Sequence, residues 1–238
     1  MTTIDSVVAE LRSKGSEKTR VTYERHGVPL ARSLGVSVAD LKIIAKKIKG
    51  QQALAMELYA TGIFEAMYLA GIVADGAKMT REQLQAWAEG CDGLNMISDY
   101  TVPWVAVENA GGRGLAMQWI ASDAEFLEAV GWRTYAGLVT TKPNEALDLV
   151  EIESLLKMVV KRIGGAKNRV KYTMNGFVIT VGSYVLPLAD QALATARQLG
   201  KVQVDMGDTA CEVPLATAYI AKVADAGKQG VKRKTIRC

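Results

Sequence analysis

The sequence contains a single histidine, His26, and three widely spaced cysteines, Cys91, Cys211 and Cys238. One histidine is too few for a zinc site with histidine and cysteine ligands at ordinary spacing. No nucleophile motif accompanies His26, so the sequence does not indicate a serine–histidine or cysteine–histidine catalytic device. An odd number of distant cysteines favours reduced thiols in a cytoplasm over a disulfide framework. The sequence therefore predicts a cytoplasmic chain with no metal and no cofactor.

Long apolar runs are also absent. No run reaches the roughly 18 residues that a membrane span needs. The N-terminal stretch MTTIDSVVAELRSKG carries acidic residues early and lacks the apolar block of a secretory signal. We therefore expect a soluble chain with no membrane partner. With 238 residues, of which 49% are hydrophobic, the chain can bury a large core, and one domain over residues 1–238 is predicted.

Apolar residues recur at helical spacing almost everywhere in the chain. The clearest stripe comprises Ile152, Leu155, Leu156, Val159 and Ile163. Paired helical segments, separated by glycine or proline, return about every 40 residues, a period typical of HEAT-type hairpins. We therefore predict an all-α fold, an α-α superhelix or solenoid of HEAT-like antiparallel helix pairs.

Two segments near the end depart from this pattern. Residues 201–213, KVQVDMGDTACEV, alternate polar and apolar side chains, which predicts an irregular insertion or a short strand. A last helix is expected over residues 215–226. Residues 227–238 then form a basic C-terminal tail without acidic side chains.

The formal net charge of +4 is small, but the basic residues are clustered. One cluster straddles a glycine turn and comprises Lys161, Arg162, Lys167, Arg169 and Lys171. Further groups lie in residues 42–49 and in the tail. Such clusters can mark a nucleic-acid interface. The alternative is that cations near a helix C-terminus complement the helix dipole.

The most prominent acidic residue is Asp99, in the segment NMISDYTVPWV, just before a helix that carries Pro103 in its first turn. An aspartate at this place can be a helix N-cap. A carboxylate in a groove can also stabilise positive charge on a sugar, or orient a water, during cleavage of a glycosidic bond. The glycine-rich GGRG at residues 111–114 lacks the strand and the GK[ST] ending of a phosphate-binding loop, so a helix–helix turn is expected there.

Three stretches resemble a known family. They are HGVPLARSLGVSVADLKIIAKKIKG from residue 26, then ELYATGIFEAMYLA, and then SDYTVPWVA followed by QWIASDAEFLEAVGWR. In this order they resemble the N-terminal segment, the second helix pair and the central pair of the DNA alkylation repair proteins made of HEAT-like repeats, of the alkylpurine DNA glycosylase D type. The resemblance covers residues 26–184, and residues 201–238 look like the ending of a distinct subgroup.

The resemblance implies a C-shaped solenoid that holds duplex DNA in a basic concave face. Active members release cationic alkylated purines with one aspartate, two tryptophans and a nearby arginine. Carried over by position, the aspartate falls on Asp99 and the arginine falls on Arg133 or its neighbour Thr134. The tryptophans fall on Asn95 and Gly176, so both are replaced here.

The missing tryptophans matter because an aromatic face stabilises a nearby cation. Candidate substitutes are Trp104, Trp132 and Phe177, with Tyr100 as a further option. The expected DNA contacts are Asn95, Arg133 and the basic cluster of residues 161–171.

Three hypotheses remain. The first is a DNA-binding relative of the repair enzymes with altered or weak base excision. The second is an active alkylpurine DNA glycosylase that uses Asp99 and a substitute aromatic residue. The third is a helical-repeat scaffold for protein interactions.

Overall fold

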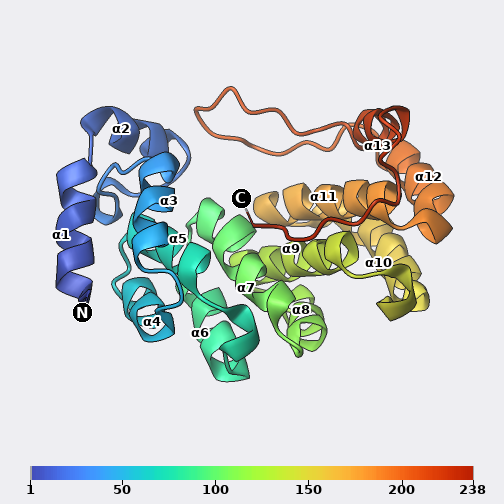
Figure 1. The fold of residues 1–238 in the computed structure, drawn as a ribbon. Coiled ribbons are helices and arrows are strands. Elements are labelled where there is room, and N and C mark those ends of the chain that lie inside the picture. Colours follow the sequence, from blue (N-terminus) through green and yellow to red (C-terminus); the bar gives the residue numbers. More distant parts are fainter. Residues whose placement is uncertain (1, 238) are drawn as a thin grey trace. The chain divides into compact units, whose positions relative to one another are not determined.

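The computed structural model describes residues 2–237, so Cys238, the last residue of the predicted basic tail, lies outside the described residues. Thirteen α-helices and no β-strand occur between residues 2 and 237, which confirms the prediction of an all-α fold. The helices fall into two compact units that divide near Gly112 (Figure 1). The single domain over residues 1–238 stays a prediction.

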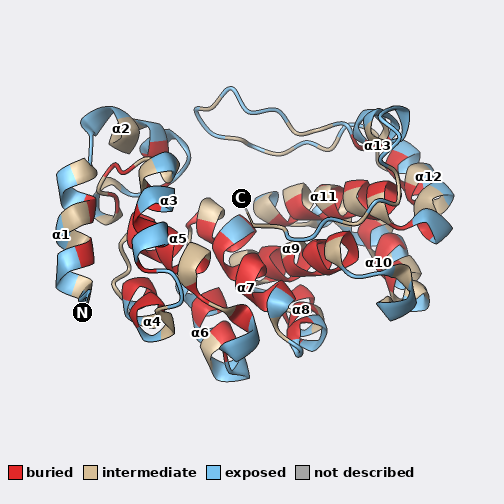
Figure 2. Cartoon of the chain, viewed as in Figure 1, coloured by how far each residue is buried: buried red, intermediate tan, exposed pale blue. Residues whose placement is uncertain are grey.

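The first unit is built around one buried helix. Eight of the ten residues of α5 (Phe64–Val73) are buried (Figure 2). Hydroxyl side chains of Thr3, Ser37 and Thr80 cap three of the surrounding helices by accepting a hydrogen bond from a first-turn N–H. The other helices of this unit are α1 (Ile4–Lys14), α2 (Glu17–Arg25), α3 (Val38–Lys47), α4 (Gln52–Ala60), α6 (Arg81–Gly90) and α7 (Val102–Glu108).

The second unit packs its core around two long helices of 17 residues each, α9 (Glu125–Thr141) and α11 (Asn168–Tyr184). Four of the five residues of the stripe predicted from the sequence lie on α10 (Leu149–Arg162), where they are buried and face this core. The fifth, Ile163, is the C-cap of α10 and packs against the core partly buried. The remaining helices are α8 (Gly112–Ile120), α12 (Ala189–Leu199) and α13 (Ala216–Asp225).

No single helix within residues 2–237 combines the length and the apolar composition of a membrane span. The helix pair Asn168–Tyr184 and Leu186–Leu199, bent by 115°, meets these two criteria only when the pair is taken together.

Residues 201–213 form the long loop between α12 and α13 (Figure 1). The irregular alternative of the prediction is therefore the one observed, and none of these residues is in a strand. Alternation alone does not make a strand, because its N–H and C=O groups need a neighbouring strand as partner. Asn168 at the start of α11 holds this loop instead, with two hydrogen bonds of 2.8 Å to the backbone of Asp205.

The basic tail runs back along the second unit, where the dark red chain passes α11 and α9 (Figure 1). The N–H of Gly230 donates to the carbonyl of Ser183 at the end of α11, over 2.8 Å. At the end of α9, the Nζ of Lys232 donates to the carbonyl of Val139 over 2.8 Å. Lys232 therefore binds a helix C-terminus, the position at which the helix dipole favours a cation.

Candidate nucleic-acid interface

Asp99 lies in a short π-helical segment, η3 (Ile97–Thr101), directly before α7. The N–H of Val102 donates to the carbonyl of Ile97, five residues earlier. The next residue, Pro103, has no N–H, so the α-helical hydrogen bond to the carbonyl of Asp99 cannot form. No side chain caps α7, whose N-cap position is Thr101, so the N-cap alternative for Asp99 is wrong. Single π-turns of this kind are frequent at functional sites.

Two glycines allow this segment and α7 to approach their neighbours closely. A Cβ atom at Gly71 on α5 would lie 2.6 Å from Cγ2 and 3.1 Å from Cα of Thr101. A Cβ atom at Gly76 would lie 2.0 Å from the carbonyl oxygen of Val105. The packing leaves Asp99 only 6% exposed. The close contacts at Gly71 and Gly76 therefore fix the segment around Asp99. A larger residue at either glycine would disrupt these contacts.

The three aromatic residues proposed as substitutes all lie in the core. Trp104 is 1% exposed, and its ring meets the ring of Tyr68 edge-on at 5.2 Å between centroids. Trp132 and Phe177 are fully buried and pack against each other, also at 5.2 Å. All three rings are thus covered by the surrounding protein, and their role as aromatic contacts stays a prediction. Tyr100, next to Asp99, is the candidate ring that is exposed.

Arg133 on α9 projects toward α11 in the second unit. Its Nη1 atom lies 3.2 Å from the position that a Cβ atom would take at Gly176. Its Cζ lies 5.1 Å from the ring centroid of Tyr172, one turn earlier on α11. The Cζ of Arg169 lies 4.5 Å from the same ring. The Cζ atoms of two arginines that the sequence names as expected DNA contacts thus lie over one tyrosine ring. Thr134, the alternative position for the family's arginine, is fully buried.

The rest of the basic cluster divides into two groups. Arg162 forms an ion pair of 3.0 Å with Glu128, which is buried on α9. Burial raises the pKa of Glu128, and its bonds to Trp132 and Arg162 offset this effect only in part. Lys167 donates to the carbonyl of Asp123. These two cations tie the α10–α11 turn to the start of α9.

The remaining two lysines of the cluster are open to solvent to different degrees. Lys161 is exposed and Lys171 is half-buried. Unlike Lys167, which is also exposed, these two lysines are not used in the contacts to the start of α9 described above.

Of the GGRG segment, only Gly111 lies in the turn before α8, and Gly112, Arg113 and Gly114 form the first turn of that helix, so the helix–helix turn is shorter than predicted. Arg113 donates to both oxygens of Glu151 and to Asp148, over 2.8 to 2.9 Å. These bonds connect the start of α8 with the start of α10. Within residues 2–237, no group of three or more His, Cys, Asp or Glu side chains is arranged to hold a metal ion.

The family model described as DNA alkylation repair enzyme matches residues 7–205. The chain belongs to this family. It is 29% identical to an uncharacterized protein of Listeria innocua over 93% of this chain and 97% of that one. It is also 29% identical to an uncharacterized protein of Listeria monocytogenes, over 96% of this chain and 100% of the relative.

A solved structure extends this family relationship to the fold. It belongs to a family of proteins related to the HEAT-like repeat DNA glycosylases with affinity for branched DNA structures. The two chains share 35% identity, each is covered over 100% of its length, and the TM-score is 0.90. The predicted fold of HEAT-like repeats and the resemblance to the repair family are therefore confirmed.

Tyr172 lies in this candidate interface but is not among the residues predicted from the sequence. It lies three residues after Arg169 and four before Gly176, so all three share one face of α11. That spacing was visible in the sequence. The contact of Arg133 with Tyr172 was not visible in the sequence, because Arg133 lies on a different helix, α9.

Proposed function

We propose that this chain binds DNA, that it prefers branched DNA to linear duplex, and that its base-excision chemistry is weak or absent. Membership of the DNA alkylation repair family supports the DNA-binding part. The preference for branches rests on the neighbour described above, whose family has affinity for branched DNA structures.

The observation that carries the proposal is the set of cations on α9, α10 and α11. The guanidinium groups of Arg133 and Arg169 lie over the ring of Tyr172, and Lys161 and Lys171 flank the α10–α11 turn in sequence. Cations of this kind bind nucleic acid by neutralising phosphates and releasing condensed counterions. The proposed interaction is therefore mainly electrostatic.

The expectation of weak chemistry rests on the surroundings of Asp99. A carboxylate that stabilises a developing charge must contact the reacting sugar or water. Asp99 is 6% exposed, and the rings of Trp104, Trp132 and Phe177 are buried. Positions 95 and 176 carry asparagine and glycine, which offer no aromatic face to a cation.

The experiment compares a linear duplex with a four-way junction of the same arm sequences, by fluorescence anisotropy at several salt concentrations. We expect tighter binding to the junction. The plot of log affinity against log salt should fall with a slope of about −0.9 per phosphate neutralised. The double variant Lys161→Ala/Lys171→Ala should bind more weakly and lose roughly 1 to 2 units of that slope.

The matched control is Arg197→Ala/Lys222→Ala, which removes the same charge from exposed positions on α12 and α13. It should leave both affinity and slope close to wild type. Equal losses in the two double variants would mean that net charge, and not this surface, controls binding. Absence of binding to both DNAs would favour the protein-interaction scaffold.

A further inference from the structure

The basic tail of residues 227–237 is anchored on the ends of two helices of the second unit. At the end of α11, the carbonyls of Gly182 and Ser183 accept hydrogen bonds from the tail over 2.9 and 2.8 Å. At the end of α9, the carbonyls of Val139 and Thr140 do so over 2.8 and 3.0 Å. The last four carbonyls of a helix have no partner within the helix. The tail therefore caps α9 and α11 together, from a distant part of the chain.

The anchoring bonds leave most of the charge of the tail unused. Their donors are the side chains of Gln229 and Lys232 and the backbone N–H groups of Gly230 and Arg233. Lys232 is thus the cationic side chain that serves as an anchor. Three other cationic side chains are exposed and take no part in these four bonds, and we call them the tail strip: Lys228, Arg233 and Lys234.

The tail changes the electrostatic character of this end of the second unit. The C-terminus of a helix carries about −0.5 elementary charge, so the uncapped ends of α9 and α11 would repel a phosphate. The four donors pair with carbonyls that carry this charge, and the tail strip adds three positive charges. Lys142, the exposed C-cap residue of α9, adds another, whereas Glu145 is the acidic residue whose charge acts on Lys232. A surface that would repel anions thus becomes one that attracts them.

The tail strip is separate from the basic cluster of residues 161–171. That cluster lies at the starts of the same two helices, where the N–H of Arg169 on α11 donates to Glu125 on α9 over 2.7 Å. Because α9 has 17 residues, its two ends are roughly 25 Å apart at about 1.5 Å per residue. Groups more than about 10 Å apart usually contribute independently to a free energy. The tail also lies beyond residue 205, where the match to the family model ends.

We propose that the tail strip is a second DNA-binding surface, which binds backbone phosphates in addition to those bound by the cluster of residues 161–171. This inference rests on the proposed DNA binding and deepens it, since it assigns a role to a segment outside the family match. Lysine and arginine side chains bind such phosphates by releasing condensed counterions. Because the tail is already docked on α9 and α11, its cations lose less conformational freedom on binding than those of a flexible arm.

The first test removes two charges of the tail strip and leaves its anchors in place. Arg233→Ala/Lys234→Ala keeps the N–H that donates to Thr140, and both side chains are exposed, so urea unfolding should match that of the wild type. Binding of the full chain to a four-way junction is followed by fluorescence anisotropy at several salt concentrations. We expect a loss of roughly 1 to 2 units of the salt slope and of about tenfold in affinity at 0.1 M salt.

The matched control is again Arg197→Ala/Lys222→Ala, which also removes one arginine and one lysine from exposed positions of the second unit. It should bind as the wild type does. Equal losses in the two double variants would make net charge the cause and overturn the inference. Wild-type affinity and slope in Arg233→Ala/Lys234→Ala would also overturn it, while leaving the proposed DNA binding in place. Absence of DNA binding by the wild type would overturn both.

A combined variant tests whether the two surfaces are separate. When Arg233→Ala/Lys234→Ala is added to Lys161→Ala/Lys171→Ala, the losses of slope should add and the factors lost in affinity should multiply. A quadruple variant that binds no more weakly than either double variant would show one shared surface and overturn the inference.

The role of docking is tested through an anchor that carries no charge. Gln229→Ala removes the bond to Gly182. The affinity should fall about 2- to 10-fold, the net value of one hydrogen bond, while the salt slope stays, since every cation is still present. Gln229 is thus a positioning residue, and Gln198→Ala, at an exposed position on α12, is its control. Unchanged affinity in Gln229→Ala would overturn the part of the inference that depends on docking.

A last measurement distinguishes DNA from another anionic surface. Co-sedimentation with vesicles of phosphatidylcholine and phosphatidylserine is compared for the wild type and Arg233→Ala/Lys234→Ala. We expect no difference between the two proteins. Vesicle binding that is lost in the variant, with DNA binding unchanged, would assign the tail strip to a lipid surface and overturn the inference.

Discussion

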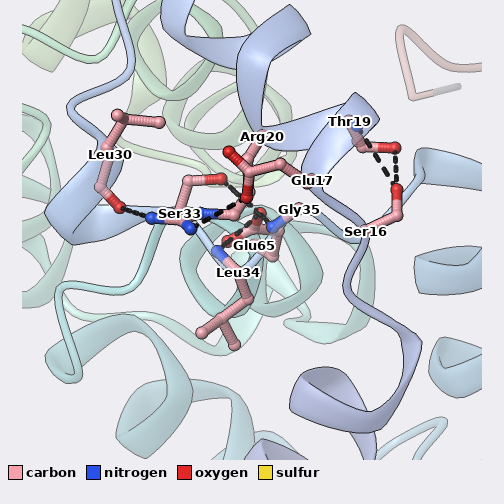
Figure 3. A network of polar contacts seen from close by, with 9 residues as sticks. All are labelled: Ser16, Glu17, Thr19, Arg20, Leu30, Ser33, Leu34, Gly35 and Glu65. Atoms are coloured by element: carbon pink, nitrogen blue, oxygen red, sulfur yellow. Dashed lines mark hydrogen bonds and ion pairs between the residues drawn. The ribbon is translucent and has the colours of Figure 1, made fainter.

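Glu65 accepts a hydrogen bond from the backbone N–H of Gly35 over 2.6 Å. The same carboxylate is fully buried on α5 and also accepts from the Ser33 hydroxyl and from the N–H group of Leu34 (Figure 3). It accepts a further hydrogen bond from the N–H group of Val36. Gly35 has a φ of +78°, which other residues rarely adopt. A buried acid and a turn that requires glycine therefore hold each other in place before α3 begins.

Glu65→Gln should lower the free energy of unfolding by about 2–3 kcal/mol, since the amide replaces one acceptor oxygen by a donor and leaves backbone N–H groups without a bond. Urea unfolding of the full chain measures this loss. Glu57→Gln, at an exposed position on α4, is the control and should stay within about 0.5 kcal/mol of wild type. Equal stability of the two variants would contradict the network described here.

Gly71→Ala should disturb the segment that carries Asp99. The added methyl would lie 2.6 Å from Thr101, including a backbone atom at 3.1 Å, so the π-helical segment must shift. We expect a loss of about 1–3 kcal/mol in the free energy of unfolding. Gly164→Ala serves as the comparison, because nothing lies within 4 Å of its added methyl. A fully stable Gly71→Ala protein would show that the segment adapts freely.

Lys232 should make stability depend on alkaline pH. Burial lowers its pKa from 10.5 to about 8, and Glu145 opposes the shift. Between these two values the unfolded chain binds more protons than the folded chain, so the free energy of unfolding contributed by this group rises with pH. Lys232→Met removes the titration. The stability of wild type relative to this variant should therefore increase from pH 8 to pH 10.5, whereas a constant difference would mean that the lysine is solvated.

Excision of alkylated purines should be weak or absent. Single-turnover release of 3-methyladenine and 7-methylguanine is measured for the wild type and for Asp99→Asn, with binding to the same DNA as a control. Removing an electrostatic group that stabilises a transition state typically costs about 10²–10³ in rate. Robust release that falls by this factor in Asp99→Asn would establish an active glycosylase. Background release in both, with DNA binding retained, is the expected outcome.

Some local features could be predicted because they depend on short-range physics. Hydroxyl caps such as Ser37 and Thr80, and the stripe on α10, follow from helix geometry and from the spacing of apolar side chains. Residues 201–213 could not be assigned in the same way. Their alternation is compatible with a strand, but pairing depends on a neighbour that the local sequence does not specify.

The sequence by itself determined the all-helical repeat fold and the family, and it identified Asp99, Arg133 and Arg169 as candidate site residues. It could not separate functional aromatic residues from core ones, because Trp132 and Phe177 have the same helical spacing in either role. The packing of α9 against α11 decided that question by burying both rings. The same packing placed Arg133 beside Gly176 and Tyr172. Contacts between helices distant in sequence depend on the complementary shapes of two surfaces, and only the tertiary structure brings those surfaces together.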